Sequence, residues 1–159
     1  MATLPQLLEE DIQRLNDELR TLLERSDATT ALIIDQGGFL ITSAGDARKF
    51  DLTTIAALAS GAYLANQTIA NLVHETNFNS VYQQGERFSM FVTCVDESCQ
   101  LVVIFRAEVS VGVVKYFAAP AAEQIASQMK VAHQRDPEAG LDLSVLNLAD
   151  TSEVFKRKE

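Results

Sequence analysis

The feature that most constrains this chain is the stretch TTIAALASGAYLANQTIANLV, residues 53–73, which contains no charged side chain. A helix without a charged face either crosses a membrane or is covered by protein on more than one side. Polar residues such as Asn66, Gln67 and Asn71 interrupt the apolar core of about 20 residues that a bilayer requires. We therefore expect a helix that protein covers on more than one side, with Asp51 as its N-cap.

Composition and charge narrow down what could cover such a helix. The 159 residues are 47% hydrophobic and 22% charged, which is typical of one globular domain. The net charge is −9, and an acidic surface repels phosphate backbones and anionic lipids. We therefore expect neither a nucleic acid nor a membrane as partner. Because the acidic, amphipathic N-terminus does not have the pattern of a signal peptide, we expect a cytoplasmic protein.

The N-terminal segment has the pattern of an amphipathic helix. Leucine and isoleucine recur at spacings of three and four from residue 4 to residue 22, with charged residues between them. Thr3 and Gln6 fit a capping box, and Pro5 fits the first helical turn. We expect the helix to begin at this box and to pack on a sheet.

Several runs of apolar and β-branched residues predict strands. Residues 31–34 and 39–41 flank a turn with two glycines, which indicates a β-hairpin. FSMFVTCV and QLVVIF flank the turn VDES in the same way, and NFNSVYQQG contains a shorter strand. The runs at 31–34 and 101–105 are apolar at every position, which is typical of strands covered on both faces. The predicted order is helix, two strands, helix, three strands, helix, with helices on both faces of the sheet.

A last helix and a change of composition complete the chain. The helix is expected from about Ser110 to Gln134, with a kink or a restart around Tyr116 to Pro120, because proline removes one helical hydrogen bond. After residue 136 the sequence becomes polar, with scattered apolar residues. We expect a domain over residues 1–136 and a mobile polar C-terminal tail over residues 137–159.

The uncharged helix can be divided into two faces by its periodicity. The face expected to lie on the sheet carries Ile55, Leu58, Ala62, Ala65, Ile69 and Leu72. The opposite face is expected to carry Ala57, Ser60, Gly61, Leu64, Thr68 and Asn71. Because small uncharged residues favour the close approach of another backbone, we interpret the second face as a protein interface. A loop of the same chain that covers this face is the alternative.

Few residues indicate chemistry. Cys94 and Cys99 form neither a zinc site nor a CxxC motif; they are either two reduced thiols or a pair that faces across a hairpin. His74 and His133 lie at helix ends, where no nucleophile is indicated, and no GxxxxGK[ST] motif occurs. We expect no catalytic residues, no metal site and no cofactor.

Several segments together carry a family resemblance. IIDQGGFLITSAGD, the helix with LASGAYLA, and then FVTCV, QLVVIF and SVGVVK follow one another within about residues 5–135. They resemble the roadblock/dynein light-chain family, and within it the bacterial MglB-like proteins. The resemblance implies an α+β fold of order α-β-β-α-β-β-β-α with an antiparallel five-stranded sheet. It also implies a homodimer in which the central helices lie side by side and the two sheets join.

The resemblance further implies a function. The helical layer of an MglB-like dimer contacts one Ras-like small GTPase of the MglA type in its GTP state. It supplies no arginine finger and repositions the GTPase's own catalytic residues, in cell polarity or motility. The alternative is a roadblock scaffold or adaptor dimer that only links partners. The resemblance assigns partner binding to the matching positions Ala57, Gly61, Leu64, Ala65 and Thr68. At two of them this chain departs from the family, because Leu64 and Thr68 replace the usual alanine or glycine.

Overall fold

A computed structural model describes residues 4–46 and 48–135 of the chain. Its five strands form one antiparallel sheet in the order β2-β1-β5-β4-β3. The predicted order of elements and the predicted sheet are confirmed. The elements are α1 (Glu9–Ser26), β1 (Thr30–Asp35), β2 (Leu40–Gly45), α2 (Leu52–Leu72), β3 (Ser80–Gln83), β4 (Phe88–Cys94), β5 (Cys99–Arg106) and α3 (Val111–Gln134).

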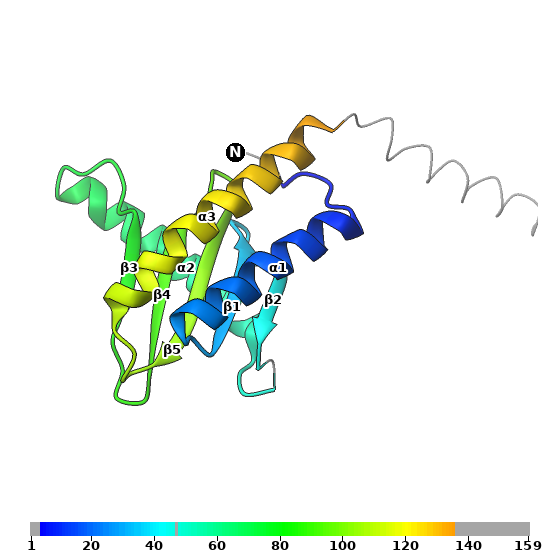
Figure 1. Cartoon of the computed structure of the whole chain (residues 1–159). Coiled ribbons are helices and arrows are strands. Elements are labelled where there is room, and N and C mark those ends of the chain that lie inside the picture. Colours follow the sequence, from blue (N-terminus) through cyan, green and yellow to red (C-terminus); the bar gives the residue numbers. More distant parts are fainter. Residues whose placement is uncertain (1–3, 47, 136–159) are drawn as a thin grey trace, which may run out of the picture.

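Helices cover both faces of the sheet, but unequally. Figure 1 shows α1 and α3 side by side on one face and α2 alone on the other. The central strand β5 serves both layers, because alternate side chains of a strand point to opposite faces. Leu101 and Phe105 pack beneath α1 and α3, whereas Val102 and Ile104 pack beneath α2. This double burial explains why the strand is apolar at successive positions.

The hairpin between β1 and β2 brings its turn against α2. Asp35 Oδ1 accepts a hydrogen bond from the backbone N–H of Phe39 at 2.8 Å, which closes the turn. Gly38 has a φ of 88°, and a Cβ at this position would lie 3.1 Å from the Cα of Ala57 on α2. The turn and the helix therefore approach at backbone distance.

The start of α1 differs from the prediction. The helix begins at Glu9, Gln6 precedes it, and Thr3 lies outside the described residues. The backbone N–H of Leu8 donates instead to Asp11 Oδ2 at 2.8 Å. The carboxylate in the first turn, where the helix dipole favours negative charge, thus selects the start of the helix.

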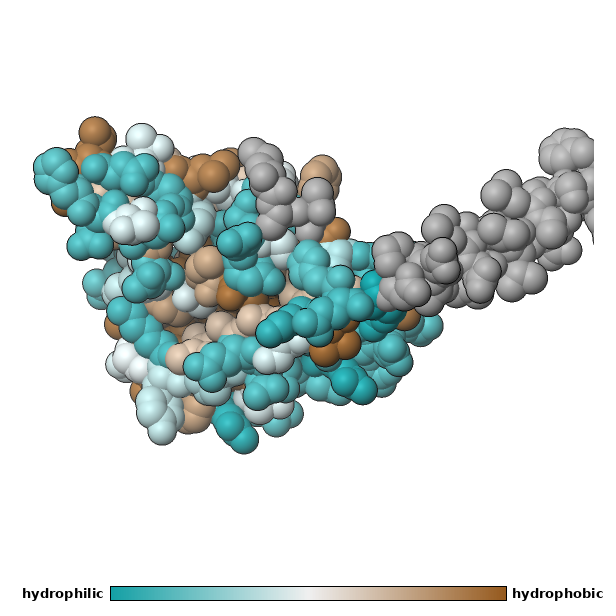
Figure 2. All heavy atoms as spheres, turned by 90° about the horizontal axis from the view of Figure 1, so that it is seen from above, coloured by the Kyte–Doolittle hydropathy of each residue, from teal (hydrophilic) through white to brown (hydrophobic). Residues whose placement is uncertain are grey.

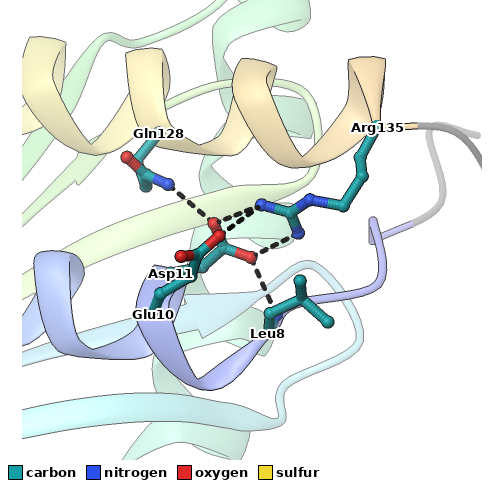
Figure 3. A network of polar contacts seen from close by, with 5 residues as sticks. All are labelled: Leu8, Glu10, Asp11, Gln128 and Arg135. Atoms are coloured by element: carbon teal, nitrogen blue, oxygen red, sulfur yellow. Dashed lines mark hydrogen bonds and ion pairs between the residues drawn. The ribbon is translucent and has the colours of Figure 1, made fainter. Parts of the chain in front are cut away.

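Asp11 also connects the two helices of this layer. Its side chain is fully buried, and it accepts hydrogen bonds from Gln128 Nε2 at 2.7 Å and from both terminal nitrogens of Arg135. Figure 3 shows the four donors converging on the carboxylate, with Glu10 next to them. The first turn of α1 is therefore held against the end of α3.

The last helix is continuous. Ser110 caps α3 by accepting a hydrogen bond from the N–H of Gly112 at 3.2 Å, and the helix runs through Pro120 to Gln134. The predicted restart is therefore wrong, because buried residues on both sides of the proline, among them Ala118 and Ile125, keep the helix on the core. The tail predicted over residues 137–159 lies outside the described residues. No helix in the described part of the chain is long and apolar enough to cross a membrane.

Candidate partner-binding surface

The N-terminal half of α2 is firmly anchored. Asp51, the predicted N-cap, accepts hydrogen bonds from the backbone N–H of Thr54 at 3.2 Å and from its hydroxyl at 2.6 Å. These hydrogen bonds from Thr54 hold the pKa of the Asp51 carboxyl below its usual range. Ser60 Oγ, near the middle of the helix, donates to the carbonyl of Gln36 at 2.8 Å. The cap and this bond fix which face of α2 meets the sheet.

The face that meets the sheet is only partly the predicted one: Ile55 packs on the core as expected, and Ala62 is half-buried. Leu58, Ala65, Ile69 and Leu72 were expected on the sheet, but Leu58, Ile69 and Leu72 are exposed and Ala65 lies beside them on the outer side. Ser60, expected on the outer face, is buried. The turn at Gly38 approaches α2 at backbone distance beside Ala57 and Ser60, so a small residue fits there. The side chains that α2 buries are Leu52, Ala56, Ala59, Ser60, Tyr63 and Ala70.

Large apolar side chains consequently point away from the sheet. Leu58 is 68% exposed, Leu64 57% and Leu72 74%. Figure 2, which views the molecule from above, shows brown hydrophobic residues reaching the rim on the side opposite α1 and α3. The five positions to which the family resemblance assigns partner binding all lie outside the buried face of this helix: Ala57, Gly61, Leu64, Ala65 and Thr68. We call these five, together with Leu58, Ile69 and Leu72, the outer face of α2.

Gly61 lies near the centre of the outer face. A Cβ added at this position meets no atom of the described residues within 4 Å. Among residues 4–46 and 48–135, no loop therefore covers the centre of this face, and the turn at Gly38 approaches only its edge, at Ala57. Nothing within the described chain requires glycine here.

The C-terminal end of α2 lies beyond the sheet. In Figure 1 this end, drawn in green, projects past β3. Between α2 and the strands β3 and β4 remains a shallow hollow about the size of one water molecule, which Ala62, Val81 and Met90 help to line. β3 pairs with β4 on one side, and no described strand pairs with its other side. The helix end and the sheet edge are therefore open on the same side of the molecule.

A second, larger hollow lies at the opposite flank of α2. Its open volume is about 990 Å³, and we call it the polar hollow. Sequence reasoning missed it, although Gln100 at the start of an apolar strand is an unusual residue and could have drawn attention to it. It is lined by Gln36, Tyr63, Leu64, Gln67, Asn77, Cys94, Asp96, Glu97 and Gln100.

The two cysteines are free thiols on opposite faces of the sheet. Cys94 is exposed and lines the polar hollow, whereas Cys99 is buried beneath α1 and α3. They are therefore not a facing pair, and the alternative of two reduced thiols holds. Burial, and to a lesser degree the Asp96 carboxylate, raises the pKa of the Cys99 thiol well above its usual range. No group of residues in the described part of the chain has the composition of a metal site.

Comparison with known proteins agrees with this architecture. The Roadblock/LC7 domain family matches residues 15–105. The chain belongs to this family. A comparison with curated protein sequences gives no significant match.

Solved structures of MglB are similar to this roadblock chain over most of its length. The gliding protein MglB from Thermus thermophilus is 28% identical, with a TM-score of 0.76 over 83% of this chain and 100% of that chain. Myxococcus xanthus MglB is 27% identical, with a TM-score of 0.75 over 82% of this chain and 98% of that chain. A structure described as MglB with tetrameric arrangement is 28% identical, with a TM-score of 0.77 over 83% and 99% of the two chains.

Proposed function

We propose that this protein is a cytoplasmic homodimer that binds a bacterial Ras-like small GTPase of the MglA type through the outer face of α2. It binds the GTP state and stimulates hydrolysis by repositioning the GTPase's own catalytic residues, in cell polarity or motility. It has no catalytic residues of its own. The similarity to a protein described as gliding protein MglB supports motility as the process.

The observation that carries the proposal is the orientation of α2. A helix of 21 residues without charge buries mainly alanine and serine against its own sheet, besides Leu52 and Tyr63. It exposes several leucines, of which two are more than two-thirds exposed. Burying such a side chain contributes about 1.5–3 kcal/mol, which the single chain leaves unused. A contiguous exposed apolar face of this kind marks a protein interface.

The open side of the molecule supports self-association. The unpaired edge of β3 and the projecting end of α2 lie next to each other (Figure 1). A second copy related by a twofold axis can cover both the edge of β3 and the end of α2. Two strand edges pair with each other, and an isologous interface uses the same patch of each copy. Two copies of α2 then form one layer, whose outward side is available to the GTPase.

Single-turnover GTP hydrolysis by the MglA-type GTPase of the same organism, with and without the full chain, tests the proposal. We expect an acceleration of at least about tenfold, which corresponds to about 1.4 kcal/mol of barrier lowering. Binding to the GTP state without acceleration would instead establish the scaffold or adaptor dimer. Absence of binding to the GTPase in either nucleotide state would refute the proposal.

A further inference from the structure

Six of the nine residues that line the polar hollow beside α2 carry a side-chain carboxylate or amide. Two carboxylates, Asp96 and Glu97, come from the turn between β4 and β5, and the amides of four residues complete the wall. No basic side chain lines it. Figure 2 looks onto the end of the sheet at which this turn lies.

One residue that lines the polar hollow, Gln100, has a buried acceptor without a donor. Gln100 is 2% exposed, and no described residue donates a hydrogen bond to its Oε1. Its side chain shares the α2 face of β5 with Val102, and the residues paired with it across the sheet are Ile34 and Cys94. Isoleucine has no donor, and the Cys94 thiol donates to the carbonyl of Asp96 at 3.2 Å. A buried unpaired acceptor costs free energy that a donor from outside the chain can recover.

The carboxylates give the polar hollow a net negative charge. Asp96 Oδ1 accepts hydrogen bonds from the backbone N–H groups of Ser98 and Cys99, at 2.7 Å and 2.9 Å, which fixes the turn. Glu97 forms no ion pair with a described residue. Burial, followed by the neighbouring Cys94 thiol, raises the pKa of Tyr63 to about 12, so its phenol remains neutral. The polar hollow therefore favours a cation with several hydrogen-bond donors.

We propose that the polar hollow receives an arginine side chain of the protein that docks on the outer face of α2. A guanidinium carries five donors in one plane, which suits several acceptors at different angles better than a compact ammonium does. Leu64 belongs to both surfaces, so a protein on the outer face lies directly beside the polar hollow. The inference rests on the proposed docking and specifies which partner side chain recognises this flank.

The ligand chemistry can be tested without any partner protein. N-acetyl-arginine amide and its neutral isostere, N-acetyl-citrulline amide, are titrated into the ¹⁵N-labelled full chain while the side-chain amide resonances of Gln100 and Gln67 are followed. We expect shifts with the arginine compound alone. They should be lost in Glu97→Gln, lost at Gln67 in Gln100→Met, and kept in Glu123→Gln on α3. Equal shifts with both compounds, unmoved Gln100 resonances, or shifts that survive in both hollow variants would overturn the proposal.

Gln100→Met also separates binding from folding. Because methionine removes the unpaired acceptor at similar volume, we expect an unchanged or higher melting temperature together with loss of the arginine response. A lower melting temperature with the response retained would mean that the Gln100 amide serves the fold and not a ligand, and would contradict the proposal.

The MglA-type GTPase gives the second readout. Glu97→Gln is expected to weaken its binding roughly three- to tenfold at low salt, less at high salt, whereas Glu123→Gln leaves it unchanged. If the GTPase does not bind the native chain but the arginine compound still shifts the Gln100 resonances, the arginine site in the polar hollow is supported and the proposed function is refuted. If the GTPase binds the native chain and Glu97→Gln equally and the arginine compound has no effect, only the arginine site fails.

Discussion

Arg135 and Asp11, 124 residues apart in sequence, form a bidentate ion pair at 2.7 Å and 3.0 Å. The pair closes the layer of α1 and α3 with bonds inside the chain (Figure 3). On the other side of the sheet, α2 has an anchored start and an exposed apolar outer face. The two helical layers therefore differ in how they are covered. The layer of α1 and α3 is closed by bonds within the chain, whereas the outer face of α2 is left open to a partner.

Breaking the Asp11–Arg135 pair is expected to destabilise the domain. Asp11→Ala leaves an arginine without its carboxylate and the N–H of Leu8 without its acceptor, and we expect a loss of about 3 kcal/mol in the free energy of unfolding. Asp17→Ala, which removes the exposed pair between Asp17 and Arg20, is the matched control with an expected change below about 0.5 kcal/mol. Urea unfolding measures the free energy of unfolding of both variants. Equal losses would show that the buried pair stabilises the domain no more than the exposed pair does.

The same carboxylate predicts a pH dependence. The hydrogen bonds from Arg135, above all, hold the pKa of Asp11 well below its ordinary value of 3.8. The folded state therefore binds this proton less readily than the unfolded chain, so the stabilisation is fully present above about pH 4 and is lost as the pH falls below that value. Asp11→Asn has no carboxylate at this position and therefore lacks this pH-dependent stabilisation. The difference in unfolding free energy between the native chain and Asp11→Asn should thus shrink from about pH 5 towards about pH 3, and a constant difference would contradict the assignment.

Two glycines should respond oppositely to the same substitution. Gly45 has a φ of 101°, and a Cβ there would collide with the carbonyl oxygen of Thr29, so Gly45→Ala should cost at least about 2 kcal/mol. Gly61 has open space around it, and Gly61→Ala should stabilise the monomer by up to about 1 kcal/mol through helix propensity. Urea unfolding at protein concentrations that dissociate the dimer measures both. A destabilised Gly61→Ala monomer would show that the chain itself requires this glycine.

Local signals were sufficient to predict most of the fold. The cap at Asp51, the start of α3 near Ser110 and the two hairpins depend on residues close in sequence, and they were predicted correctly. The start of α1 was not, because the leucine periodicity continues upstream of Glu9, whereas the carboxylate that sets the start is held by Arg135. The contact between Asp11 and Arg135 joins residues far apart in the chain, so no local sequence pattern indicates it.

The candidate site could be predicted only in part. Hydropathy alone assigns large apolar residues of α2, such as Leu58 and Leu72, to the sheet. The structure exposes Leu58, because the turn at Gly38 holds a neighbouring face of the helix at Ala57 and Ser60. It exposes Leu72, because this end of α2 projects past the sheet (Figure 1). Absence of charge on the helix indicated an interface but could not orient it. The unpaired Gln100 depends on which residues lie opposite it in the sheet, and that register is not readable from the sequence.

A charged side chain at the centre of the outer face should separate assembly from folding. Gly61→Arg points into open space in the monomer, so the domain should keep its circular dichroism spectrum and unfold with near-native stability. In a complex, the same arginine is buried without a partner, and we expect dimer formation and GTPase binding to weaken at least about tenfold. Ala119→Arg, which adds the same side chain at an exposed position of α3 on the opposite face, is the matched control and should leave both unchanged.

Analytical ultracentrifugation measures dimer formation, and titration with the GTPase measures its binding. Native-like assembly of Gly61→Arg would place the interface elsewhere, whereas loss of the dimer in both variants would indicate that added charge, and not position, is responsible.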